Sequence, residues 1–257
     1  MLEHAPDFAV RMASSAEDIQ AAQRLRYQVF VQELGADGPQ VDHKAAIERD
    51  QFDPFADHLL LEDLHADAPT RLVGVYRLLT RAGAAQAGGF YSETEFDLTA
   101  LKQSDRSLLE LGRSCLHPSY RGGAGMLHLW AGLASFVSTQ QIDVLFGVAS
   151  FHGTDLGALA QPLSHLFYAH AAAPDFTAVA ISAQAVALDI LPQSAVDRKA
   201  AILATPALIK AYLRLGGVVG QGAFVDNAFN TTDVMMILET AKMAPNALQT
   251  IKMAVQT

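Results

Sequence analysis

The chain has 257 residues, of which 51% are hydrophobic and 18% are charged, and its formal net charge is -9. This composition excludes a disordered chain, and the length is sufficient to bury the core of a complete enzyme. The single cysteine, Cys115, excludes an internal disulfide and a cysteine-rich zinc site, and it fits a reducing compartment. The acidic balance argues against general nucleic-acid binding.

The first residues, MLEHAPDFAV, lack the basic region and apolar core of a secretory signal. The longest weakly charged stretch, residues 176–190, is interrupted by Asp189 and is shorter than the ~20 apolar residues of a membrane span. We therefore expect a soluble, cytoplasmic protein.

The first predicted element is a helix. Ser14 and Glu17 have the spacing of a capping box, and apolar residues then recur at helical spacing from Ile19 to Phe30. The pattern predicts an amphipathic helix of about five turns, with Arg26 off its apolar stripe.

The first predicted strands are residues 58–62 and 71–79. A polar turn separates them, and this pattern predicts an antiparallel pair. The run 108–116 is a third strand, and the glycine-rich turn 120–125 leads from it into a helix. The later predictions are a buried strand over 143–150, helices over 156–170 and 208–217, and strands near 218–225 and 233–238. This order predicts an α+β (mixed α/β) fold, as a single domain over 1–257 with an insertion around 171–205.

The glycine-rich turn contains Arg121, Gly122 and Gly123. A turn of this kind between a strand and a helix can bind an anion, because free backbone N–H groups and the helix dipole point toward it. A purely structural turn is an equally good interpretation of this segment alone.

The segment ERDQFDPFAD (48–57) has four carboxylates, and Phe52 and Phe55 lie between them. Such a run is most often a solvated loop, but the interleaved aromatic residues favour a loop that covers a pocket. Its carboxylates could bind the ammonium groups of a cationic amino acid, and one with a raised pKa could serve as a base.

The strand segment ELGRS (110–114) places Glu110 and Arg113 in apolar surroundings, which is costly unless the charges are paired or used. An ion pair between Arg113 and an acid of residues 48–57 is one interpretation, a functional site is the other, and both can hold together.

Ser150, His152 and Asp155 have the residue types of a hydrolase triad, but a GxSxG elbow is missing and we do not expect a triad. His152 is expected near a pocket. No sequence pattern indicates a metal site. Cys115 is expected to be a small core residue.

Several ordered blocks of the sequence resemble the ornithine N-acyltransferases, which make lyso-ornithine lipid. They are RLRYQVFVQELG (24–35), ERDQFDPFADHLLL (48–61), LVGVYRLL (72–79), GFYSETEFDL (89–98), LELGRSC (109–115), YRGG (120–123), FGVASFHGTD (146–155) and LIKAYLRLGGVVGQGAFVDNAFNTTDV (208–234). The first five blocks also resemble acyl-homoserine-lactone synthases, whereas the last is characteristic of the ornithine enzymes.

The resemblance implies an N-acetyltransferase-like (GNAT-like) fold, with a central, mostly antiparallel sheet, splayed strands and flanking helices. It implies transfer of a 3-hydroxyacyl group from acyl carrier protein to the α-amine of L-ornithine. The donor would be a phosphopantetheine thioester, and no permanently bound cofactor is implied. The alternatives are an enzyme like the acyl-homoserine-lactone synthases and an acyl-CoA-dependent N-acyltransferase that acts on another amine. A catalytically inactive binding module is disfavoured, because the charged blocks are retained.

The resemblance also implies roles for individual residues. The catalytic candidates are Glu48 and Glu110. The substrate-binding candidates are Arg26, Phe30, Asp50, Asp53, Arg77 and Arg113. The donor-binding candidates are Ser114, Cys115, Leu116, Arg121, Gly122 and Gly123. The carrier protein is expected to dock on Arg121, Arg198 and Lys199, and the amphiphilic product implies transient peripheral contact with the inner membrane.

Overall fold

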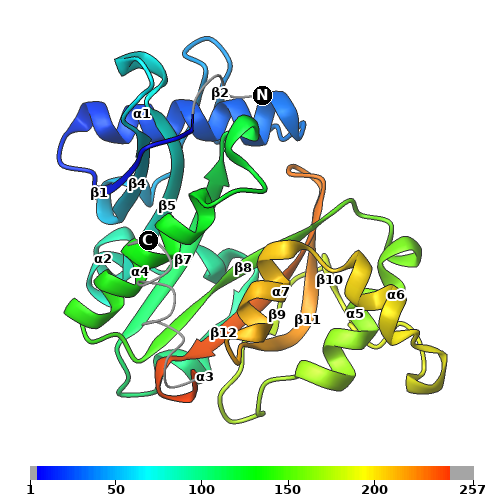
Figure 1. Ribbon diagram of the computed structural model, residues 1–257. Coiled ribbons are helices and arrows are strands. Elements are labelled where there is room, and N and C mark those ends of the chain that lie inside the picture. The colour runs from blue at the N-terminus through cyan, green and yellow to red at the C-terminus, as the bar shows by residue number, and fades with distance from the viewer. Residues whose placement is uncertain (1–4, 244–257) are drawn as a thin grey trace. The chain divides into compact units, whose positions relative to one another are not determined.

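The computed structural model describes residues 5–243, and Figure 1 labels its helices and strands. These residues form two compact units, of which the first holds residues 5–89 and 111–142 and the second holds residues 90–110 and 143–243. Within residues 5–243, no helix combines the length and the apolar character that a transmembrane span needs. A single domain over 1–257 stays a prediction, and the ends of that range lie outside the described residues.

The sheet of the first unit has the strand order β1-β4-β5-β7. Strands β4 and β5 are antiparallel, so the pair predicted for residues 58–62 and 71–79 is confirmed. Strand β1, which the sequence analysis did not predict, pairs with β4. The bounds are β1 Phe8–Met12, β4 Asp57–Asp63, β5 Leu72–Thr80 and β7 Leu108–Leu116, with a separate hairpin of β2 Val41–Asp42 and β3 Ile47–Glu48.

Two helices of the first unit, α1 and α4, pack against the strands of its sheet. Leu60, Val75 and Cys115 form a buried cluster with residues of α1. Side chains alternate between the two faces of a strand, so Leu61 and Leu116 point to the other face, toward α4. The helical elements are α1 Ala16–Arg26, the π-helix η1 Tyr27–Glu33, α2 Arg81–Ala87, α4 Gly125–Thr139, and the 3-10 turns η2 Asp53–Phe55, η3 Ala68–Thr70 and η5 Pro118–Tyr120.

The start of α1 differs by one residue from the prediction. The N-cap is Ser15, whose hydroxyl accepts a hydrogen bond from the Asp18 backbone N–H at 3.2 Å. The Asp18 carboxylate in turn accepts one from the Ser14 backbone N–H at 2.8 Å. The capping box predicted for Ser14 and Glu17 is therefore wrong.

The sheet of the second unit has the strand order β8-β12-β11-β9-β6, and β10 pairs with β11. The first residues of β7 pair in parallel with β8, whereas β12 is antiparallel to both β8 and β11. The strands are β6 Phe96–Asp97, β8 Val144–His152, β9 Val179–Ala180, β10 Ala185–Val186, β11 Val218–Asp226 and β12 Thr231–Glu239. The helical elements are η4 Tyr91–Thr94, α3 Thr99–Lys102, α5 Leu156–His170, η6 Gln193–Ala195, α6 Arg198–Ala204, α7 Ala207–Arg214 and η7 Thr240–Lys242.

The structure confirms the predicted α+β class, with mostly antiparallel strand pairing and flanking helices. Strands β7, β8, β11 and β12 and helices α5 and α7 lie where the sequence placed them. The proposed insertion, residues 171–205, contains β9, β10 and α6. The splayed strands of the resemblance stay a prediction.

Candidate active site

Three arginines of the first unit have buried side chains. Arg26 at the end of α1 is 1% exposed, Arg77 of β5 is 3% exposed and Arg113 of β7 is 9% exposed. The expectation that Arg26 lies off the buried stripe is wrong, because α1 packs against β3 as well as β5. A buried guanidinium requires carboxylate partners, since its desolvation is costly.

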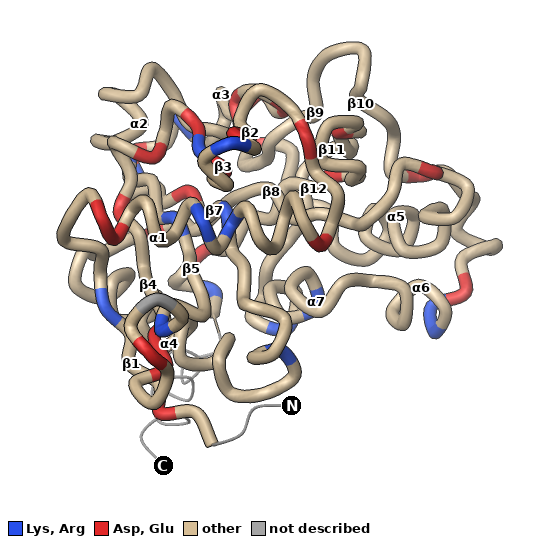
Figure 2. Tube along the Cα trace, turned by 90° about the horizontal axis from the view of Figure 1, so that it is seen from above, with Lys and Arg blue, Asp and Glu red and all other residues tan. Residues whose placement is uncertain are grey.

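The carboxylates of the 48–57 segment supply those partners in a closed ring of ion pairs. The members in ring order are Glu48, Arg26, Asp53, Arg77, Asp50 and Arg113, and Arg113 returns to Glu48. The N···O distances in that order are 2.5, 2.8, 2.9, 2.6, 3.1 and 3.1 Å. Figure 2 shows the acidic and basic segments together around α1, β3 and β7. Three positive and three negative charges make this ion-pair ring electrically neutral.

The ring controls the protonation of its carboxyl groups. Burial alone would raise the pKa of Asp53, but the positive charges of Arg26 and Arg77 outweigh burial and hold the pKa well below its ordinary value. The pKa of Asp50 is lowered in the same way, with burial opposed by Arg77 and Arg113. Both aspartates are therefore ionised at neutral pH.

Asp50 and Asp53 form ion pairs with arginines in this ring. This observation favours a pairing role for the two aspartates, and not the binding of a cationic substrate. The 48–57 segment is also not a solvated loop, because Glu48 and Asp53 are at most 2% exposed. Phe52 packs under the Arg77 guanidinium, 5.7 Å from its ring centre, whereas Phe55 is 40% exposed. The predicted ion pair between Arg113 and this segment is confirmed by the contacts with Glu48 and Asp50.

Arg113 has an unusual backbone conformation for a strand residue, with φ of 49°. Non-glycine residues rarely adopt this left-handed conformation, which costs of order 1–3 kcal/mol and is concentrated at functional sites. Its side chain is fixed by the two ring carboxylates, so the ring stabilises the distortion of β7.

Glu110 lies in the second unit and is 3% exposed. Its carboxylate oxygens accept hydrogen bonds from the backbone N–H groups of Tyr91 at 2.8 Å and Ser92 at 2.6 Å. The turn η4 thus fixes the carboxylate with uncharged donors. Phe90, just before that turn, contacts Phe146 of β8 edge to face at 5.0 Å between ring centres.

The predicted donor-binding residues of the first unit form the end of β7 and the turn after it. The Ser114 Oγ is buried and has no hydrogen-bond partner among the described residues. Cys115 is buried in the core cluster, which confirms the predicted core position, and burial raises the pKa of its thiol to about 12. A Cβ added at Gly122 or Gly123 would meet open space, so these positions leave the backbone accessible.

Arg121 and Phe30 have defined surroundings in the first unit. The Arg121 guanidinium makes a two-pronged ion pair with Glu33 at 2.5 and 2.7 Å, and its Nε donates to the Leu116 carbonyl at 3.1 Å. Phe30 lies in the π-helix and packs against the core cluster under α1. π-Helical turns occur frequently at functional sites.

Ser150, His152 and Asp155 lie on β8 and at the start of α5. The Asp155 carboxylate caps α5 by accepting from the backbone N–H groups of Gly157 and Ala158. Ser150 and His152 alternate with buried residues on β8, and both are exposed.

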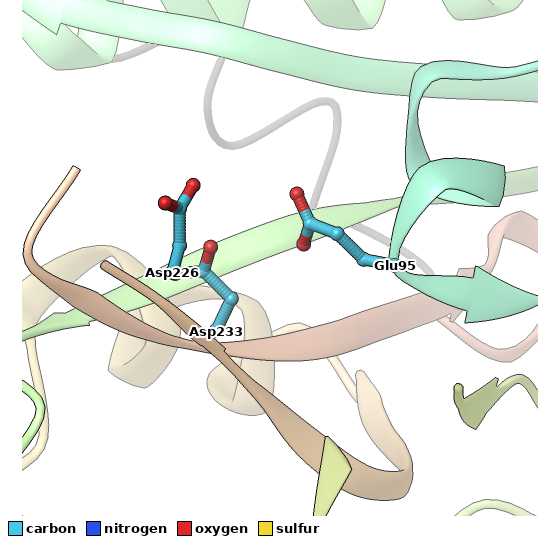
Figure 3. Close-up of side chains that lie close together, drawn as sticks. All are labelled: Glu95, Asp226 and Asp233. Atoms are coloured by element: carbon cyan, nitrogen blue, oxygen red, sulfur yellow. The ribbon is translucent and has the colours of Figure 1, made fainter. Parts of the chain in front are cut away.

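An acidic cluster in the second unit has no counterpart among the residues predicted from the sequence. The carboxylates of Glu95, Asp226 and Asp233 converge in Figure 3, and their oxygens lie within 4.8 Å of one another. Glu95 and Asp233 are buried and Asp226 is partly buried. Three converging carboxylates can bind a divalent cation or an organic ammonium group. The signal in the sequence is weak, because the residues come from three separate elements.

Comparison with known proteins identifies the family. The chain is 53% identical over 241 residues to the L-ornithine N(α)-acyltransferase of Rhodobacter capsulatus, and the match covers 92% of each chain. The chain belongs to the L-ornithine N(α)-acyltransferase family. The profile of the acetyltransferase (GNAT) domain also matches residues 25–131. The family resemblance drawn from the sequence is thus confirmed, and the protein is an acyltransferase.

Two solved structures have the same fold. FeeM, an N-acyl amino acid synthase from uncultured soil microbes, aligns with a TM-score of 0.55 at 12% identity and covers 98% of both chains. The CoA-dependent acyl-homoserine lactone synthase BjaI aligns with a TM-score of 0.56 at 15% identity, over 98% of this chain and 90% of its own. These likenesses confirm the GNAT-like fold.

Proposed function

We propose that this protein transfers a 3-hydroxyacyl group from acyl carrier protein to the α-amine of L-ornithine and so forms lyso-ornithine lipid. The observation that carries the proposal is the similarity to an L-ornithine N(α)-acyltransferase along nearly the whole chain. That similarity covers 92% of the chain and therefore extends into both compact units.

The reaction needs positioning and proton transfer. The amine nitrogen attacks the thioester carbonyl carbon, the tetrahedral intermediate expels the pantetheine sulfur as a thiolate, and the amine proton passes through a base to that sulfur. A thioester is already activated, so the protein must align the two reactants, accept the proton and stabilise the oxyanion.

Of the two candidate bases, we favour Glu110 over Glu48. Both oxygens of Glu48 are in ion pairs, with Arg26 and with Arg113, and a proton on this carboxylate would weaken both pairs. Glu110 accepts hydrogen bonds from two backbone N–H groups, which orient the carboxylate. Glu48 and the rest of the ring then act by positioning β7.

The donor is proposed to lie along Ser114, Cys115 and Leu116, with a backbone N–H of this segment as the oxyanion donor. The buried Ser114 Oγ supports this placement, because an unpaired buried hydroxyl costs of order 1–3 kcal/mol and a donor amide or carbonyl would satisfy it. Gly122 and Gly123 leave space for the phosphate of the pantetheine arm. No resident cofactor or metal takes part in these steps.

The surface residues proposed to bind the carrier protein are Arg121, Arg198 and Lys199. Arg198 and Lys199 are exposed in the first turn of α6, and Arg121 is paired with Glu33. We further propose that the enzyme works in the cytoplasm and touches the inner membrane peripherally as its amphiphilic product leaves. Leu203, at 72% exposure, is an apolar residue suited to such contact.

The test is to incubate the purified protein with L-ornithine and either 3-hydroxyacyl carrier protein or the matching acyl-CoA, and to determine the product by mass. We expect the N-acyl-ornithine mass with the carrier protein as donor. Absence of ornithine-dependent acyl transfer from both donors overturns the proposal. If the protein prefers acyl-CoA, acyl-CoA is the donor and the carrier protein is not.

A further inference from the structure

We infer that the end of α6 and the exposed side of α7 bind the surface of an anionic lipid bilayer. The inference rests on the proposed function and deepens it, because it names the residues and the lipid class of the membrane contact proposed there. Ile202 and Leu203 supply the apolar part of this α6–α7 surface, and Lys210 and Arg214 supply its positive charge. All four residues belong to the second unit.

Leu203 is unusually exposed for an aliphatic side chain. It is 72% exposed, and its neighbour Ile202 is 41% exposed. Within residues 5–243, no other large apolar side chain exceeds 44%. Single exposed apolar residues need no explanation, whereas adjacent bulky ones are typical of surfaces that contact a partner or a membrane. The end of α6 therefore has the apolar character of an interaction surface.

The packing of α6 explains why these two side chains point outward. The start of the helix is fixed to α5 by a hydrogen bond from the Asp197 N–H to the Gln161 side chain at 2.8 Å. Ala201 is fully buried, and α6 packs against α5. Successive residues of an α-helix are about 100° apart, so Ile202 and Leu203 turn away from the side that Ala201 buries. The small side of α6 thus faces the protein and its bulky side faces the solvent, which is the reverse of a helix that contributes to a core.

Positive charge lies next to the apolar pair. The Lys210 ammonium group donates a hydrogen bond to the Ile202 carbonyl at 3.3 Å, which places α7 beside the end of α6. Lys210 and Arg214 are four residues apart, so they share one side of α7, away from the buried residues of that helix. Figure 2 shows the basic segments of both helices. The sequence from Arg198 to Val225 has four basic residues and no acidic one, so the positive charge of this region is not balanced along the chain.

An anionic bilayer matches this combination of groups. Aliphatic side chains enter the boundary between headgroups and acyl chains, while Lys and Arg side chains contact the anionic headgroups. Each basic residue near an anionic leaflet strengthens binding about 5-fold, and each buried CH2 group strengthens it about 4-fold. A stable dimer instead buries roughly 800 Å² per partner, which is far more than two aliphatic and two basic side chains supply. The same surface gives the amphiphilic product of the proposed reaction a short route into the bilayer.

The test is sedimentation of the purified protein with vesicles of phosphatidylcholine, with and without phosphatidylglycerol. We expect the unaltered protein to bind the anionic vesicles at least about 10-fold more tightly than the neutral ones, and added NaCl to reduce that difference. Leu203→Ala should weaken binding to the anionic vesicles by about 10- to 50-fold, because it removes three carbon atoms from the bilayer contact. The double variant Lys210→Gln with Arg214→Gln should weaken it about 25-fold and leave binding to neutral vesicles unchanged.

The matched controls are Leu64→Ala and Lys44→Gln, which remove the same groups from exposed positions of the first unit. Both should keep the affinity for anionic vesicles. Leu203 is mostly exposed, so its truncation should leave the melting temperature unchanged. An unaltered protein that does not bind anionic vesicles overturns the inference. Equal losses of binding in Leu203→Ala and Leu64→Ala overturn it as well.

Vesicle binding needs no substrate, which separates this inference from the proposed function. Binding that depends on Leu203, in a protein without acyl transfer, keeps the surface and overturns the function. Acyl transfer by a protein that does not bind vesicles keeps the function and overturns the surface.

Two other occupants of the α6–α7 surface are distinguished without vesicles. The carrier protein is one, because its proposed contacts Arg198 and Lys199 lie in the first turn of the same helix. If Leu203→Ala raises the KM for acyl carrier protein in a vesicle-free assay, the carrier protein covers this surface and the inference is overturned. A second copy of the chain is the other. If the unaltered protein is a dimer that Leu203→Ala separates, the surface is a dimer interface and the inference is likewise overturned.

Discussion

The two candidate bases differ in what holds their carboxylates. Glu48 contacts the guanidinium groups of Arg26 and Arg113, whereas Glu110 is held by the peptide N–H groups of η4. Replacement of a carboxylate by an amide removes the negative charge in both cases. Replacement of Glu48 leaves the buried guanidinium groups of Arg26 and Arg113 with one carboxylate partner fewer.

Glu110→Gln should reduce kcat by about 10²- to 10⁴-fold, the usual contribution of a general base, and should leave the melting temperature nearly unchanged. Single-turnover acyl transfer and thermal unfolding measure the two quantities. Glu17→Gln, at an exposed position in the first turn of α1, is the matched control. A Glu110→Gln variant with full turnover would contradict the role of Glu110.

Arg26→Ala should destabilise the protein by about 3–5 kcal/mol, because it leaves Glu48 and Asp53 buried without their shared partner. Arg121→Ala removes an ion pair whose side chains are 41% and 33% exposed, and it should cost about 0–1 kcal/mol. Denaturant unfolding gives both values. Equal losses in the two variants would show that burial of the ring does not determine its contribution.

The ring also predicts an acid-dependent loss of stability. The folded-state pKa of Asp53 lies below the unfolded value of ~3.9, so the ionised form stabilises the folded state above that value. The contribution of Asp53 to the free energy of unfolding should be constant above about pH 5. It should decrease as the pH drops below ~4. Asp53→Asn should flatten that fall, as measured by denaturant unfolding across pH; an unchanged slope would argue against the ion pairs.

At the scale of the elements, the contact of α4 with β1 and β4 depends on a glycine. A Cβ added at Gly132 would lie 2.5 Å from Val10 Cγ1 and 3.1 Å from Leu59 Cδ2. Gly132→Val should therefore destabilise the protein by about 1–3 kcal/mol through overpacking. Gly123→Ala, where an added Cβ meets open space, should be close to neutral by the same thermal unfolding assay. A stable Gly132→Val variant would contradict the close approach of α4.

Local sequence patterns predicted most elements. They were least accurate where tertiary contacts determine the local structure or the burial of a residue. The apolar spacing from Ile19 to Phe30 is equally compatible with an α-helix and with the observed change to a π-helix after Arg26. The one-residue error at Ser15 arose because adjacent serines offer the same capping chemistry. Arg26 is buried because α1 packs against β3. The spacing of residues within one helix does not predict a contact with another element.

The candidate site was predictable in part for the same reason. The 48–57 segment and ELGRS carry opposite charges in apolar surroundings, and that imbalance predicts their ion pairs. The acidic cluster has no such local signal. Glu95 is separated from Asp226 and Asp233 by most of the second unit's sequence, and only the β11–β12 register and the position of η4 bring the three together.

At the scale of the whole molecule, the net charge of -9 conceals how charge is distributed. Three of the acidic residues belong to the ion-pair ring, where three arginines balance their charge. The acidic cluster is mostly buried. Helix α6 instead exposes Arg198 and Lys199, and the sequence from Arg198 to Val225 contains no acidic residue. The acidic carrier protein that we propose as the donor would therefore meet two exposed cations on α6 of an acidic enzyme.

This distribution predicts a salt-dependent affinity for the carrier protein. Exposed charges are screened within ~8 Å at physiological ionic strength, so the KM for acyl carrier protein should rise several-fold between about 0.05 and 0.3 M NaCl while kcat changes little. A double variant, Arg198→Ala with Lys199→Ala, should raise KM at low salt and flatten its salt dependence. Lys44→Ala, which removes an exposed cation from the first unit, should leave both unchanged. If the KM of the unaltered protein is insensitive to salt, the carrier protein docks through uncharged contacts. If the double variant and the Lys44→Ala control have equal effects on KM, only the net charge of the enzyme matters.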